Sequence, residues 1–299
     1  MLLFRRLVVR RVKMPSVIIA TIVVLLMGTA TLTAFEKRAW SASEPLPPSA
    51  QDHENPGALS RSVPSPDLSR LTASGAVDPA RVAASGSAGF SIRRTGPLRP
   101  DGDARDFVRS LKRRSDAGEG TASYDIFLAV LDCRRLYDQV PAIEDDEAAR
   151  RLGECESLLG DAALTDVDWL SRAVAQGSLE AKLLYAINPA YSLPGGATAY
   201  LAEPDAVQKW RKTSRRYLEE AVSYGSQDAL LLLSSAYGAG VIVGQDRVAQ
   251  FAYALAAQQI APIDGFQEGY GSLRRSMTIE EQRSAELRAQ TIRESCCKR

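Results

Sequence analysis

The chain has 299 residues, of which 37 are Lys or Arg and 36 are Asp or Glu, and its net charge is +1. A balance this close to neutral gives no general electrostatic reason to expect nucleic acid as a partner. The one histidine, His53, lies in a segment rich in proline and serine. This excludes a folded site that uses His as a general base or zinc ligand, and we expect no catalytic, cofactor or metal site.

The first 40 residues predict a membrane anchor. Residues 1–14 contain five Lys or Arg and precede an uncharged stretch, PSVIIATIVVLLMGTATLTAF, at residues 15–35. About 20 apolar residues span a bilayer as a helix, and basic flanks stay in the cytoplasm. We therefore expect residues 15–35 to be a signal anchor crossing a bacterial inner membrane once. Residues 1–14 would be cytoplasmic and the remainder periplasmic. The alternative is a cleaved signal peptide.

Residues 36–120 are predicted to form a disordered linker. Most of the chain's prolines lie here, among many Ser, Ala and Gly residues, and such a segment buries too little apolar area to offset the entropy of ordering it. Within it, residues 103–114 predict a short amphipathic helix with Phe107, Val108 and Leu111 on one face. A transient helix inside the linker is the alternative.

From residue 121 onward the pattern predicts helices. Residues 123–140 have apolar side chains at three- and four-residue spacing, and Pro141 interrupts them. Residues 144–159 begin with acidic side chains, which a helix N-terminus favours. We expect these two segments to form a helical hairpin, and we interpret the acidic cluster as the start of its second helix.

The four cysteines suggest disulfide bonding if the chain is exported. Cys133 and Cys155 lie on opposite arms of the predicted hairpin at similar distances from its turn. In an oxidising compartment they should pair, which would contribute about 3 kcal/mol. Two unpaired thiols are the alternative. Cys296 and Cys297 are adjacent, and the sequence does not choose among the three possible pairings.

Two segments 48 residues apart share one pattern, WLSRAVAQGSLEAKLLY at residues 169–185 and YLEEAVSYGSQDALLLL at residues 217–233. Eight of the 17 positions are identical, and a period of this size indicates a helical array. Gly177 and Gly225 stand where a helix must end, because glycine adopts the left-handed cap without a Cβ penalty. Small side chains let neighbouring helices approach closely, and they recur at Ala173, Ala181, Ala221 and Ala229.

These residues resemble the Sel1-like repeat family, a relative of the tetratricopeptide repeats. The matching positions are Trp169, Ala173, Gly177 and Ala181 in one unit, and Tyr217, Ala221, Gly225, Ala229, Leu233, Tyr237, Gly240, Val241, Asp246, Ala249, Tyr253, Ala256 and Ala257 in the next. The departures are Ser234 in place of a glycine, a predicted loop insertion at residues 188–204, and Pro262 soon after the last match. The resemblance implies an α-solenoid that mediates protein–protein contacts, and it implies no chemistry.

The remaining motifs fit this architecture. Thr278 and Glu281 have capping-box spacing, and the helix that follows would cover the end of the stack. The basic run at residues 209–216 is interpreted as the solvated face of a helix, with a phosphate or an anionic polymer as the alternative ligand.

The sequence therefore predicts an all-α protein with a short α-solenoid of stacked antiparallel helix pairs at residues 121–299. We expect a non-enzymatic, membrane-tethered scaffold or adaptor that binds other cell-envelope proteins. Two alternatives stay open. A glycan- or peptide-binding module would need a basic and aromatic groove near Trp210 and Arg211. A carboxylate-based hydrolase would need two acidic side chains that converge in a cleft.

Overall fold

The computed structural model describes residues 68–85, 89–94, 96–139 and 146–297. These residues are mostly helical, which confirms the all-α prediction in its coarse form, although a two-stranded sheet precedes the helices. In the described ranges no helix is long and apolar enough to cross a membrane. The expected signal anchor at residues 15–35 lies outside them, as do the expected cytoplasmic segment 1–14 and linker residues 36–67.

Two helix pairs form the first half of the folded region. Helix α3 (Ala104–Asp116) packs on α4 (Gly120–Asp138), and α8 (Trp169–Ala175) is followed by α9 (Leu179–Ile187). Between the pairs lie three short helices, which are α5 (Asp146–Gly153), α6 (Glu156–Leu159) and α7 (Ala162–Thr165). Helix α4 packs on α8, so the two pairs are in direct contact.

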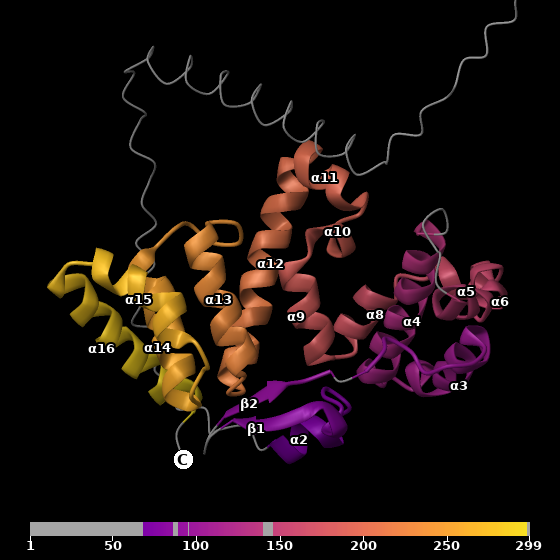
Figure 1. The fold of residues 1–299 in the computed structure, drawn as a ribbon, viewed down its shortest axis with the longest axis horizontal. Helices are drawn as coiled ribbons and strands as arrows, with labels where there is room; N and C mark the ends of the chain where they lie inside the picture. The colour runs from indigo at the N-terminus through magenta and orange to yellow at the C-terminus, as the bar shows by residue number, and fades with distance from the viewer. Residues whose placement is uncertain (1–67, 86–88, 95, 140–145, 298–299) are drawn as a thin grey trace, which may run out of the picture. The chain divides into compact units, whose positions relative to one another are not determined.

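The second half continues the same arrangement. Helix α9 packs on α12 (Pro204–Ser223), α12 on α13 (Gln227–Ala239), and α13 on α14 (Arg247–Ile260). Helix α15 (Phe266–Ser276) then leads to α16 (Ile279–Cys296), which packs on α14. Figure 1 shows these helices following one another in chain order from α3 to α16. Consecutive helices are therefore spatial neighbours, as in a stack.

The turn inside three of the helix pairs has one repeated geometry. Gly118, Gly177 and Gly225 all adopt positive φ, of 94°, 91° and 82°. At each, the glycine N–H bonds to a carbonyl three residues back and the next N–H to a carbonyl five residues back. This is a Schellman cap, which satisfies the last carbonyls of a helix. We call these three turns the glycine turns.

The glycine turn at Gly118 shows that the repeating part begins before residue 121. Helix α3 buries Ala104, Val108 and Leu111 against α4, so residues 104–116 belong to the first helix pair. The amphipathic helix predicted at residues 103–114 is therefore present and packed. Its apolar face is buried because α4, α6 and the segment near Trp169 supply the opposing surface.

The predicted loop at residues 188–204 is wrong, because most of it is helical. Helix α10 (Pro189–Ser192) begins with Pro189 at its first position and the side chain of Asn188 as its cap. Helix α11 (Gly196–Ala202) follows and packs on the start of α12, where Tyr200 contacts Trp210 edge to face. The insertion thus covers one side of α12.

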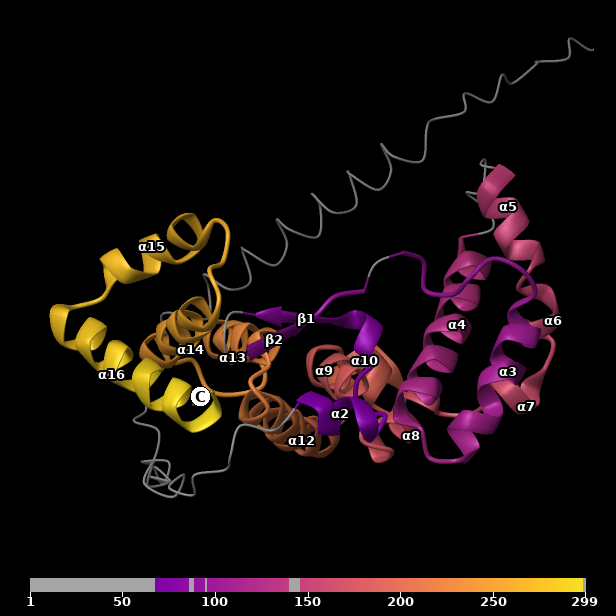
Figure 2. The ribbon, with the colours of Figure 1, turned by 90° about the horizontal axis from the view of Figure 1, so that it is seen from below.

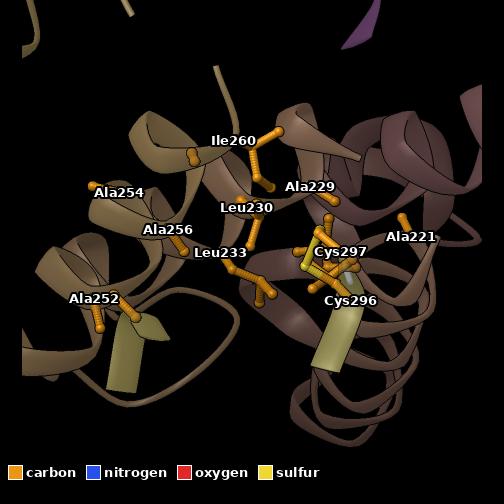
Figure 3. Close-up of a cluster of buried hydrophobic side chains, with 14 of the residues drawn as sticks. Ala221, Ala229, Leu230, Leu233, Ala252, Ala254, Ala256, Ile260, Cys296 and Cys297 are labelled. Carbon is orange, nitrogen blue, oxygen red and sulfur yellow. A yellow bond between two sulfur atoms is a disulfide. The ribbon is translucent and has the colours of Figure 1, made fainter. Parts of the chain in front are cut away.

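The largest hydrophobic cluster lies among α9 and α12–α16. Its members include Leu218, Leu230, Leu233 and Phe251, with many alanines between them. Figure 3 shows Leu230 and Leu233 beside alanines of α14 and beside Cys296 and Cys297, at the end of α16. The small side chains let α13 and α14 approach closely, as the repeat pattern predicts.

Before α3 the chain forms a compact segment that we call the strap, residues 68–100. It contains α2 (Leu68–Ala73), the 3-10 helix η2 (Pro79–Arg81), and the strands β1 (Val82–Ser85) and β2 (Gly89–Ile92). The strands pair antiparallel, with Ala83 opposite Ser91. Figures 1 and 2 show α2, β1 and β2 lying along one end of α9, α12 and α13. The predicted disordered linker at residues 36–120 is therefore wrong for residues 68–120, except at the few undescribed positions.

Candidate functional site

The strap crosses the three glycine turns in succession. The carbonyl of Gly75 accepts a hydrogen bond from Thr121 N–H at 3.3 Å, and the carbonyl of Ala76 accepts one from Leu179 N–H at 2.8 Å. Further along, Phe90 N–H donates to the carbonyl of Gly225 at 3.0 Å. Each bond joins the strap to the backbone of a different helix pair. The strap therefore ties three consecutive pairs together, each at its glycine turn or within three residues after it.

Side chains strengthen the last of these contacts. The Ile92 N–H donates to Asp228 Oδ2 at 2.6 Å, and burial raises the pKa of the Asp228 carboxyl although this bond opposes the shift. Phe90 is 3% exposed and lies in the largest hydrophobic cluster with Val77 and Leu71. The strap thus contributes apolar side chains to the core as well as backbone bonds.

Arg81 is the centre of a charged network between the strap and two helix pairs. Its guanidinium contacts Asp125 of α4 at 2.7 Å, Glu180 of α9 at 3.1 Å and Asp78 of the strap at 3.2 Å. Arg94 also contacts Asp125, at 3.2 Å. The carboxylates hold the pKa of Arg81 above its ordinary value although burial opposes this, so the arginine remains charged.

Glu180 is the most buried acid of this network, with 5% of its side chain exposed. Burial raises the pKa of its carboxyl, and the nearby Arg81 guanidinium offsets only part of that effect. Such a group is stable there because Arg81 bridges it to Asp125. Arg81, a residue of the strap, thus joins α4 of one helix pair to α9 of the next, and we call this charged network the clasp.

A cavity of about 270 Å³ lies beside this clasp. Its lining includes Arg81, Arg94, Asp125 and Phe107, together with the loop at residues 97–100. Its two carboxylates, Asp78 and Asp125, are both ion-paired with Arg81. The cavity combines charged hydrogen-bonding groups with one aromatic ring, which suits a small polar molecule more than an apolar one.

Arg99, at the end of the strap, is fully buried, and its guanidinium meets two carboxylates and several backbone carbonyls. Its guanidinium contacts Asp132 of α4 at 3.1 Å and Glu154 at 2.9 Å, and it donates to the carbonyl of Arg151 at 2.8 Å. It also lies 3.4 Å from the sulfur of Cys155. A planar guanidinium with five donors can satisfy such a set of acceptors, and a lysine cannot.

Both cysteine pairs are disulfide-bonded in the structure. Cys133 of α4 is joined to Cys155, just before α6, and both are fully buried next to Arg99. Cys296 is joined to its neighbour Cys297 at the end of α16. Among the described residues no cluster of His, Cys, Asp or Glu is arranged to hold a metal ion.

The small residues of the repeat pattern lie inside the stack. Trp169 is buried, as are Ala173, Ala181, Ala221, Ala229 and Ala249. Asp246 caps α14 by accepting a bond from Ala249 N–H at 2.8 Å, and Gly240 adopts positive φ at the end of α13. Ser234, which replaces a glycine of the family pattern, is fully buried, and its hydroxyl donates to the carbonyl of Gln250 at 2.8 Å.

The three tyrosines of the pattern are only half-buried, and cations cover their rings. Arg288 lies over Tyr237 and Tyr253, whose rings stack at 5.5 Å. Burial raises the pKa of Tyr253 to about 12. Lys182 and Arg216 flank the ring of Tyr217. These rings pack inward on one side and carry cations on the other.

The structure places the residues on which the two alternative functions depended. Trp210 is 1% exposed, and its indole N–H donates to the carbonyl of Tyr185 at 3.1 Å. The Trp210 ring beside Arg211 is therefore buried and offers no exposed face of its own. Three carboxylates, those of Asp78, Asp125 and Glu180, converge on the guanidinium of Arg81. Asp78 and Asp125 line the cavity, and Glu180 does not.

Sequence reasoning missed the strap, Arg81 and Arg99. Two local signals were present. Asp78 precedes Pro79 and caps the 3-10 helix, and Gly118 stands before α4 as Gly177 stands before α9. Neither signal identifies its long-range partners, which come from helices far along the chain.

Comparison with known proteins adds nothing to this picture, because no protein-family model and no curated protein matches the chain.

Proposed function

We propose that this chain is a non-enzymatic scaffold or adaptor, tethered to a bacterial inner membrane, whose helix stack binds other envelope proteins. The observation that carries the proposal is the repetition of one glycine turn in three consecutive helix pairs. Stacked pairs present extended outer faces, and such faces are used to bind proteins. The resemblance to Sel1-like repeats supports the same function, and both arguments rest on architecture.

The proposed location has two supports. Five basic residues precede an uncharged stretch of membrane-spanning length at residues 15–35. The folded region also carries two disulfides, which persist in oxidising compartments such as the bacterial periplasm. Together they favour a cytoplasmic N-terminus and a periplasmic helix stack.

A non-enzymatic function is favoured by the state of the polar groups. The carboxylates beside the cavity are ion-paired with Arg81, so they serve as charge partners of the clasp. Arg99 at the end of the strap is likewise paired, with Asp132 and Glu154. These groups are engaged in holding the helix pairs together.

Site-specific photo-crosslinking in intact cells tests the proposal. A photoreactive residue replaces one exposed side chain in each of three helices, at Tyr137 of α4, Gln208 of α12 and Gln259 of α14. We expect neighbouring positions to capture the same envelope protein. Buried Leu230 is the matched control and should capture none. Absence of a specific adduct at all three exposed positions would contradict the scaffold proposal.

The tether has its own test. Fractionation and N-terminal sequencing of the mature chain distinguish an anchor from a cleaved signal peptide. We expect the full chain in the membrane fraction. A soluble chain that begins near Phe35 would overturn the tether and leave the adaptor proposal standing.

A further inference from the structure

The cavity beside the clasp lies between the strap and the first helix pair. The strap supplies lining residues between positions 78 and 100, and the helix pair supplies Phe107 of α3 and Asp125 of α4. The side chain of Arg94, which lines the cavity, is 24% exposed, so solvent reaches this wall. A volume of about 270 Å³ is slightly below the range of about 300–1,000 Å³ typical of pockets that enclose drug-sized ligands. The cavity therefore has room for one small molecule.

Three of the five charged residues that line the cavity are fully engaged by the protein. Both carboxylate oxygens of Asp78 have partners, which are the N–H of Ala80 at 2.9 Å and Arg81 at 3.2 Å. Arg81 directs each of its three guanidinium nitrogens to a different carboxylate. Arg99 likewise has a carboxylate or carbonyl partner at each guanidinium nitrogen. A ligand would therefore bind through the other two charged residues.

These two residues, Arg94 and Asp125, have hydrogen-bonding groups to spare. In the described part of the chain Asp125 accepts through Oδ1 alone, from Arg81 at 2.7 Å and from Arg94 at 3.2 Å. Arg94 donates there through Nη2 alone, which leaves its Nε and Nη1 without a described acceptor and Asp125 Oδ2 without a described donor. A guanidinium has five N–H donors, and a carboxylate has about four lone-pair sites. The cavity thus holds two opposite charges side by side, each able to bind one more charged group.

We propose that this cavity binds a free α-amino acid with an apolar side chain. The carboxylate of the amino acid pairs with the guanidinium of Arg94, and its ammonium donates to Asp125 Oδ2. In an α-amino acid one carbon atom carries both charged groups, so their partners must be neighbours, as Arg94 and Asp125 are. Phe107 and Leu98 also line the cavity and give the apolar side chain a surface to contact.

A zwitterion fits this lining better than a simple anion or cation does. An anion on Arg94 would lie close to the carboxylate of Asp125, and a cation on Asp125 would lie close to the guanidinium groups of Arg81 and Arg94. Like charges repel at such distances, and they do so more strongly in a partly buried site than in water. An α-amino acid places an opposite charge against each partner and adds no net charge. Once bound, it contacts both the strap and the first helix pair, so its binding should stabilise the strap.

Calorimetric titration of the full chain in mild detergent tests the proposal with three probes. L-leucine carries both charges, 4-methylpentanoate is leucine without the ammonium, and 3-methylbutylamine is leucine without the carboxylate. We expect one leucine per chain and roughly tenfold weaker binding of either analogue, because each has lost a charged hydrogen-bonding group. An analogue that binds as tightly as leucine would show a site for a single charge and overturn the proposal. The absence of saturable leucine binding would overturn it as well.

Variants assign each charge of the ligand to its partner. Arg94→Gln should bind leucine no more tightly than it binds 3-methylbutylamine, because the partner of the carboxylate is gone. Asp125→Asn should likewise lose the preference for leucine over 4-methylpentanoate. The matched control, Arg109→Gln, removes an exposed arginine of α3 that does not line the cavity and should bind all three probes as the original chain does. An unchanged preference for leucine in Arg94→Gln would refute the site.

The Arg94 variant keeps the test decisive if Asp125→Asn does not fold. Asp125 belongs to the clasp, so circular dichroism must show that its variant is helical before binding is measured. In Arg94→Gln the clasp between Arg81, Asp125 and Glu180 is intact, and its binding result decides by itself.

Hydrogen exchange shows where leucine binds. Saturating leucine should slow amide exchange around Arg81, Arg94 and Asp125 and leave α14–α16 unchanged. Slower exchange confined to α14–α16 would place the ligand elsewhere and overturn the proposal. None of these measurements needs a membrane or a protein partner, so their failure leaves the scaffold proposal standing. Failure of the crosslinking experiment would equally leave the amino-acid site standing.

Discussion

Replacing Gly120 by alanine should destabilise the protein, although alanine is the better helix former. Gly120 is the first residue of α4 and has ordinary helical φ. A Cβ at this position would lie 2.8 Å from Ser178 N and 3.0 Å from the carbonyl oxygen of Gln176. Both atoms belong to the backbone of the next glycine turn, so neither can rotate away. Only glycine lets the first two helix pairs approach this closely.

The expected size of the effect follows from two opposing terms. Helix propensity favours alanine by at most about 1 kcal/mol. Overpacking typically costs about 1–3 kcal/mol, and contacts with fixed backbone place this site near the upper end. The net loss should be about 2 kcal/mol. For a folded region of this size that lowers the thermal midpoint by about 4–8 °C.

Thermal unfolding of the full chain in mild detergent, followed by circular dichroism, measures this effect. Gly269→Ala is the matched control, because Gly269 lies inside α15 and a Cβ there would meet nothing within 4 Å. That substitution should leave the midpoint unchanged or raise it by a few degrees, reflecting about 1 kcal/mol of helix propensity. If Gly120→Ala were as stable as the original chain, the close approach of the two turns would be refuted.

Three further predictions concern the strap, its buried arginine and the last helix. Phe90→Ala should lower the free energy of unfolding by about 3–5 kcal/mol, because the ring is buried in the main cluster, and it should speed tryptic cleavage within the strap. Arg99→Met should cost about 2–3 kcal/mol in chemical denaturation, since Asp132 and Glu154 lose their buried cation and keep only Arg151 and Arg150, and the carbonyl of Arg151 loses its donor. Hydrogen bonds from the Thr278 N–H and from Arg247 lower the pKa of the Glu281 carboxyl in the folded protein. The ionised carboxylate therefore stabilises the fold at any pH above the ordinary glutamate pKa. This stabilisation is lost as the pH falls through the lower pKa that Glu281 has in the folded protein. The thermal midpoint should therefore drop in acid, and less steeply in Glu281→Gln.

Each of these has a control that separates the stated cause from a general effect. Leu201→Ala removes an exposed apolar side chain and should leave stability and strap cleavage unchanged. Arg109→Met breaks a pair with Asp161 that is largely exposed and should cost less than about 1 kcal/mol. An Arg99→Met variant no less stable than Arg109→Met would refute the stabilising role of the buried Arg99 contacts with Asp132 and Glu154. An acid profile identical in Glu281→Gln would refute the assignment to Glu281.

The helix pairs could be predicted from the sequence because their causes are local. Ser178 and Ser226 cap helices through N–H groups three residues away, and Thr278 forms its capping box with Glu281. Glycine ends a helix through backbone freedom that depends on no other part of the chain. Even the amphipathic pattern of α3 was readable, although the sequence did not show that a partner surface existed for it.

The strap and its clasp could not be predicted, because their causes lie far along the chain. Arg81 and Glu180 are 99 positions apart, and the Ile92 N–H meets a carboxylate 136 positions away. Taken alone, a segment rich in Pro, Ser, Ala and Gly buries too little to fold. It folds here because the ends of three helix pairs supply the apolar surface, the bond partners and the counter-charges.

Trp210 shows the same division between local and long-range causes. The sequence placed an aromatic ring beside basic residues, and only the position of α11 decided that the ring is buried while the cations stay exposed. Backbone caps and helix spacing were thus determined by the sequence itself, since they act within one or two turns. Which surfaces meet was decided by the tertiary structure, because burial depends on what the rest of the chain brings to the same place.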